Sequence, residues 1–153
     1  MDALVQQVLE HYEEHSLFSR EDWKKDVGDL PMTPDDAVQM IKGQLRYILH
    51  APYISKARKM LVIEQFRNPE LAKLQTKHNY SDVMRYFTGL MKYLICNGVL
   101  TEDDPEIMAA QLCLPISTWI NLCDREPERE TEVMDLLGKH IRQFFRLYQP
   151  EVR

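Results

Sequence analysis

Two histidines four residues apart form the clearest chemical pattern in this sequence. His11 and His15 lie in the segment His-Tyr-Glu-Glu-His, and a spacing of four places both side chains on one face of a helix. With Glu14 or His50 nearby, the pair could bind a metal ion such as zinc. The zinc-protease pattern, however, has its catalytic glutamate directly after the first histidine, where this chain has Tyr12. We therefore predict no enzyme activity, no metal and no cofactor, with a metal-binding helical protein as an alternative.

Other sequence patterns for catalysis or phosphate binding are missing from the 153 residues. There is no nucleophile elbow, phosphate loop, Cys-X-X-Cys pair or glycine-rich dinucleotide motif. The net charge is −5, and the basic residues are scattered among acidic ones. Because binding to nucleic-acid phosphates needs a clustered basic surface, this segment is not expected to contact DNA directly.

The sequence also predicts a cytoplasmic protein without a membrane partner. No apolar run reaches the roughly 18 residues of a membrane span, and no signal peptide precedes the first predicted helix. The three cysteines are an odd number without metal-ligand spacing, which is typical of reduced, buried thiols. They are Cys96, Cys113 and Cys123.

Four prolines with an acidic residue close behind predict where helices begin. Each suits the first turn of a helix, where its missing amide hydrogen costs no hydrogen bond. Three follow a good capping residue, and the acids favour the positive end of the helix dipole. Between these starts apolar residues recur at helical spacing, and strand signals are nearly absent. The four are Pro34, Pro69, Pro105 and Pro127.

We therefore predict an all-α fold in one domain, residues 1–153, built as an antiparallel bundle of about seven helices. Gly98 is placed to end the fifth helix through a left-handed residue. The only long connection runs from Leu17 to Met32, and we expect Trp23 to hold it against the body. The helices are expected near residues 2–16, 34–50, 53–66, 69–77, 80–97, 104–124 and 127–148.

The last two helices, within residues 104–148, are apolar around most of their circumference. A helix of this kind must be buried on several sides, in a core, a membrane or an interface. We predict that these two helices form a homodimer interface; the alternative is that both fill the core of a monomer. The predicted interface residues are Leu112, Ile116, Trp119, Ile120, Val133, Leu137, Ile141, Phe144, Phe145 and Tyr148.

The order of these helices resembles the C-terminal regulatory domain of a TetR/AcrR-type transcriptional regulator. The resembling segments are Met1-Asp-Ala-Leu-Val-Gln-Gln-Val-Leu-Glu10, Arg67-Asn-Pro-Glu-Leu-Ala-Lys-Leu74 and Gly138-Lys-His-Ile-Arg-Gln-Phe-Phe-Arg-Leu-Tyr148. The family's helix-turn-helix head is missing, so the chain is either a fragment of a longer regulator or a protein that naturally lacks the head. Residue 2 begins the first helix without a capping approach, which favours the fragment.

The resemblance implies a role for each part of the chain. A connecting helix at residues 2–16 would transmit motion to the missing head, which alone would contact DNA. Helices within residues 34–97 would enclose a pocket for an effector. The helices within residues 104–148 would pair with their two-fold mates in a four-helix bundle. The chain would then be a ligand-responsive, dimerising regulatory domain.

The expected pocket takes its side chains from helices that should face one another. Flexible methionines suit a cavity for a small apolar or amphipathic effector, and Glu64 could supply a polar anchor. Ordinary core packing is the alternative for each residue. A helical protein-interaction module without a small-molecule ligand would instead have a solid core and an external groove. The predicted pocket residues are Tyr12, Met40, Tyr47, Met60, Glu64, Phe66, Met84, Phe87 and Met91.

Overall fold

A computed structural model describes residues 3–18, 27–28 and 31–151, and every regular element within these ranges is helical. The prediction of an all-α fold is confirmed. Helix ends lie within a few residues of their predicted positions. The α-helices are α1 (Ala3–His15), α3 (Pro34–His50), α4 (Pro52–Glu64), α5 (Pro69–Thr76), α6 (Asp82–Cys96), α7 (Pro105–Arg125) and α8 (Glu130–Leu147).

Three of the four proline signals begin an α-helix through a side-chain cap. Thr33 forms a capping box with Asp36: its hydroxyl accepts from the Asp36 amide at 3.1 Å, and its own amide donates to the Asp36 carboxylate at 3.0 Å. Asn68 and Asp104 cap α5 and α7 in the same role. The fourth signal opens the 3-10 turn η2 (Pro127–Arg129), which has no side-chain cap, and α8 follows it.

Gly98 ends α6 as predicted. Its φ of +73° is a left-handed conformation that only glycine adopts at little cost. The Gly98 amide donates to the Ile95 carbonyl at 3.1 Å, and the Val99 amide donates to the Leu94 carbonyl at 2.9 Å. This pair of bonds is the Schellman motif, which satisfies carbonyls left open at the helix end.

The predicted break between the helices at residues 69–77 and 80–97 is wrong. A π-helical turn, η1 (Lys77–Ser81), joins α5 to α6, so the backbone stays helical from Pro69 to Cys96. No proline, glycine or capping side chain interrupts the chain there, and hydrophobic spacing alone did not distinguish a widened turn from a break. π-turns inside helices are rare and often occur at functional sites.

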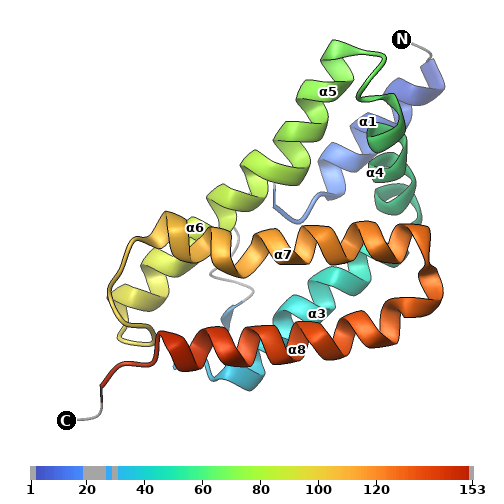
Figure 1. Ribbon diagram of the computed structural model, residues 1–153. Coiled ribbons are helices and arrows are strands. Elements are labelled where there is room, and N and C mark those ends of the chain that lie inside the picture. Colours follow the sequence, from blue (N-terminus) through green and yellow to red (C-terminus); the bar gives the residue numbers. More distant parts are fainter. Residues whose placement is uncertain (1–2, 19–26, 29–30, 152–153) are drawn as a thin grey trace.

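The helices enclose two separate hydrophobic clusters. In Figure 1, α7 and α8 lie side by side; α6 packs on α7, and α3 packs on α8. The larger cluster fills the space among these four helices and includes Phe18, Val27 and Met32 from the long connection. Trp23 lies outside the described residues. The smaller cluster joins α1, α4 and α5 and consists of Leu9, Tyr12, Ile54, Ala57, Leu61 and Leu71.

Most of the apolar side chains of α7 and α8 that were predicted to form a dimer interface lie inside the chain itself. Seven of the ten predicted interface side chains are buried in the larger cluster, and the other three are partly buried against it. Helical spacing shows that a face is covered but not what covers it. The seven are Leu112, Ile116, Val133, Leu137, Ile141, Phe144 and Phe145; the three are Trp119, Ile120 and Tyr148.

None of the described helices combines the length and the apolar character needed to cross a membrane.

Candidate functional site

A cavity of about 310 Å³ lies where the two hydrophobic clusters meet. Ile41 and Phe87 of the larger cluster form part of its wall, and Tyr12 and Ile54 of the smaller cluster form another part. The segment after α1 and one side of α7, near Ile120, complete the enclosure. Every α-helix that the structure describes except α8 contributes to this wall.

Three of the nine predicted pocket residues line this cavity: Tyr12, Tyr47 and Phe87. The other six lie elsewhere. Met91 is fully buried in the larger cluster, and Phe66 is 89% exposed just beyond α4. Met40, Met60, Glu64 and Met84 are partly buried outside the cavity wall. Which residues contact an effector therefore stays a prediction.

The π-turn provides a part of the wall that hydrophobic spacing did not reveal. His78, Asn79 and Tyr80 all belong to η1 and all line the cavity. A π-turn contains one more residue per hydrogen-bonded turn than an α-helix, so it changes which side chains face the cavity.

Two buried polar residues in the wall were also missed, although the sequence does mark them. Arg58 occupies a position in the buried stripe of α4 that also contains Ile54, Ala57 and Leu61. Gln44 interrupts the buried face of α3 in the same way. A polar residue at a core position of an amphipathic helix is uncommon and usually has a specific partner.

Arg58 finds that partner on α7. Its guanidinium binds the Asp124 carboxylate through both terminal nitrogens, with Nη2 to Oδ1 at 2.7 Å. The side chains are 4% and 15% exposed. The pair neutralises the one formal charge among the lining side chains, counting histidine as neutral, and fastens α4 to α7 beside the cavity.

Three lining residues each keep a buried polar atom without a hydrogen-bond partner among the described residues. The atoms are Gln44 Oε1, Arg58 Nε and His78 Nδ1. Each such atom costs about 1–3 kcal/mol when nothing satisfies it. Gln44 uses its other amide atom to donate to the Tyr86 hydroxyl at 2.9 Å. The wall therefore contains hydrogen-bonding capacity that the protein does not use.

Burial favours the uncharged forms of three titratable groups in the wall. Burial raises the pKa of the Tyr12 phenol to about 12 and that of the Cys113 thiol to about 11. Burial, and then the charge of Lys77, lowers the pKa of His78. A protonated thiol is a poor nucleophile, so the site favours binding over covalent chemistry.

The cavity wall also anchors α1. The Tyr47 hydroxyl donates to the His15 backbone carbonyl at 2.7 Å, which ties the last turn of α1 to α3. Ser16, Leu17 and Phe18 follow directly and line the cavity. A change in what fills the cavity would therefore act on the end of α1.

Comparisons with family models, curated proteins and solved structures found no match. The resemblance to TetR/AcrR regulators therefore depends on helix order and on the three sequence segments alone, and it stays a prediction.

A groove between α7 and α8 is a further concave feature in the described part of the chain. Gln111 on α7 and His140, Gln143 and Leu147 on α8 line it. Two polar contacts hold α7 and α8 together next to the groove. His140 Nε2 contacts the Leu112 carbonyl oxygen at 2.9 Å, and the Tyr148 hydroxyl forms a hydrogen bond with the Gln111 side chain.

Proposed function

We propose that this chain is the effector-binding regulatory domain of a TetR-like transcriptional regulator, and that its cavity holds a small, uncharged amphipathic molecule. The cavity between the two hydrophobic clusters carries this proposal. Its volume of about 310 Å³ falls at the lower end of small-molecule pockets. A compact effector with one or two rings matches that size.

The chemistry of the wall supports an uncharged ligand. Arg58 is already neutralised by Asp124, and burial keeps Tyr12 and His78 uncharged. A ligand charge would lose its hydration without gaining an opposite charge, which is unfavourable in an apolar site. A ligand hydroxyl, amide or carbonyl could instead satisfy the unused atoms of Gln44, Arg58 or His78 after small side-chain rotations.

The regulatory step follows from the position of α1. An effector that fits one arrangement of α1, α4 and the π-turn better than another would shift the population between them. The difference in affinity between the two arrangements sets the size of the response. DNA binding would come through a helix-turn-helix head outside these 153 residues, connected through α1.

A fluorescence titration tests the cavity and the ligand class together. N-phenyl-1-naphthylamine is uncharged, whereas 1-anilinonaphthalene-8-sulfonate has almost the same rings and a negative charge. We expect the uncharged dye to bind at least about tenfold more tightly, a difference of about 1.4 kcal/mol. Ile120→Trp fills the cavity and should abolish binding, whereas Ile63→Trp on the exposed side of α4 should not. Equal binding to both variants would remove the cavity as the site.

Homodimerisation is part of the same proposal, and its surface is the outer face of α7 and α8. Residues at helical spacing, all of them exposed except the half-buried His140, form one stripe on each helix, and the groove joins the stripes. A stable homodimer buries at least roughly 1,200–2,000 Å² in total. The α7 stripe contains Ile107, Gln111, Leu114 and Thr118, and the α8 stripe contains Leu136, His140, Gln143 and Leu147.

Sedimentation at micromolar concentration tests the dimer. Leu147 is 72% exposed, so Leu147→Glu should convert a dimer to a monomer without unfolding the chain. Ile63→Glu is the matched control, because Ile63 is 64% exposed on α4, away from the outer face of α7 and α8. A monomeric unmodified chain would contradict dimerisation but not effector binding.

A helical protein-interaction module is the second candidate, and the exposed side of α4 favours it. Ile63 and Tyr53 on α4 are 64% and 54% exposed, and Phe66, just beyond α4, is 89% exposed. Exposed apolar residues that form a contiguous patch often mark a binding surface. This function would leave the cavity without affinity for the uncharged dye, so the same titration separates the two candidates.

A further inference from the structure

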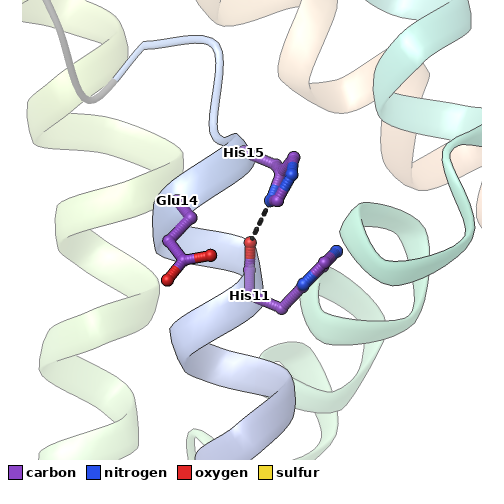
Figure 2. Close-up of side chains that lie close together, drawn as sticks. All are labelled: His11, Glu14 and His15. Atoms are coloured by element: carbon purple, nitrogen blue, oxygen red, sulfur yellow. Dashed lines mark hydrogen bonds between the residues drawn. The ribbon is translucent and has the colours of Figure 1, made fainter.

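The last turn of α1 gathers three side chains that can bind one metal ion. His11, Glu14 and His15 each offer a ligand atom, and these atoms lie within 4.8 Å of one another. Figure 2 shows both imidazoles on one side of the helix and the Glu14 carboxylate on the adjoining side. The set belongs to the outer surface of α1 and shares no residue with the cavity wall.

The tautomer of His15 is fixed in a form that can bind a metal. His15 Nδ1 lies 2.9 Å from the backbone carbonyl oxygen of His11, as the dashed line in Figure 2 shows. A carbonyl oxygen can only accept, so Nδ1 carries the hydrogen and Nε2 carries the free lone pair. Metal-binding histidines are commonly oriented by such a bond from the other ring nitrogen.

Neighbouring aromatic groups restrict the position of His11. The His11 and His15 rings stack, with centroids 4.2 Å apart and planes inclined by 23°. The ring of Tyr53, which belongs to α4, also lies close to His11, with the two ring centroids 4.1 Å apart. The hydrogen bond from Tyr47 to the His15 carbonyl holds the helix end itself. A ligand pair that is already ordered loses less conformational entropy on binding.

We propose that His11, Glu14 and His15 form a binding site for a divalent transition-metal ion, with zinc as its most suitable occupant. Two imidazoles and one carboxylate are a donor set that zinc accepts, whereas magnesium and calcium need mostly oxygen donors. Zinc ligand atoms lie about 2.0–2.2 Å from the metal, so modest side-chain rotation must close the present spacing. The negative end of the α1 dipole further favours a cation there.

The site would connect metal availability to the end of α1. Tyr12 lies between the two histidines in sequence and lines the cavity from the same turn, and Ser16 follows it into the wall. Metal binding on the outer side of this turn would hold His11 and His15 together and stabilise the helical conformation that positions Tyr12. This role does not depend on the identity of the effector.

Calorimetric titration of the full chain with zinc chloride tests the proposal. The protein should carry no histidine tag and should contain Cys96→Ser, because Cys96, unlike Cys113 and Cys123, is exposed and not buried as predicted, and its thiol can itself bind zinc. We expect one zinc ion per chain. His11→Ala and His15→Ala should each weaken zinc binding at least about tenfold, and Glu14→Gln should weaken it less. Magnesium chloride should give no binding at the same concentrations.

His50→Ala is the matched control, because His50 is also an exposed histidine but contacts Glu130 and is not one of the three proposed ligands. Zinc affinity should be unchanged in that variant. Circular dichroism establishes that each variant is folded, and His15 is exposed, so its removal does not disturb a core. Absence of zinc binding, or zinc binding by the His11→Ala and His15→Ala variants as tight as that of the parent Cys96→Ser chain, would overturn the site while leaving the cavity proposal intact.

Discussion

Arg58 and Asp124 lie 66 positions apart in the chain, and their side chains form a two-contact ion pair between α4 and α7. Both are largely buried. The pair holds together the two helices that flank the cavity from opposite clusters. Removing one partner would leave the other as an unpaired buried charge, which is costly in an apolar environment.

Arg58→Met should therefore lower the free energy of unfolding by about 3–5 kcal/mol. The double variant with Asp124→Leu should recover part of this loss, because it replaces both charges with apolar side chains. Urea unfolding of the two variants and the unmodified chain measures the difference. A double variant less stable than Arg58→Met would show that the pair does not behave as a coupled unit.

Gly98→Ala should destabilise the chain by about 1–2 kcal/mol, because alanine in a left-handed conformation crowds its own backbone. Gly43→Ala is the control, and it should change the free energy of unfolding in the opposite direction. Gly43 lies inside α3, and a methyl group there meets no atom within 4 Å. It should raise the free energy of unfolding by about 0.5–1 kcal/mol. Thermal unfolding of both variants tests the assignment of the α6 terminus.

His78 should make the stability of the chain sensitive to mild acid. Burial lowers the pKa of its imidazole in the folded state below the ordinary value of 6.5. The unfolded chain therefore binds a proton more readily, and the free energy of unfolding decreases as the pH falls through about 6.5 and below. Above that pH the effect disappears.

Urea unfolding between about pH 7.5 and pH 5.5 measures this dependence. His78→Gln should lose less stability across the interval than the unmodified chain. Parallel pH dependence in both proteins would assign the acid sensitivity to other groups.

Met91→Ala and Phe66→Ala should change the free energy of unfolding by very different amounts, although the sequence predicts both residues in one pocket. Met91 is fully buried, so its truncation should cost about 2–5 kcal/mol. Phe66 is 89% exposed, so its truncation should change stability by less than about 0.5 kcal/mol. Neither variant should weaken binding of the uncharged dye more than Ile120→Trp does.

The sequence by itself determined where most helices begin and end. Helix-end signals act through atoms only a few residues away, so they can be recognised in the sequence without knowledge of the fold. Examples are Thr33 with Pro34, Asn68 with Pro69, and Gly98. The spacing of His11, Glu14 and His15 within a single helix is local in the same sense.

The tertiary structure alone decided what each helical face contacts. Phe144 and Phe145 have the same spacing whether they fill a core or a dimer interface, and only the position of α3 against α8 shows that they are internal. The partnership of Arg58 with Asp124, and the meeting of Gln44 with His78 at one cavity, also join distant segments. Hydrophobic burial is not directional, so a pattern of apolar residues specifies that a surface will be covered and leaves its partner to the packing of the whole chain.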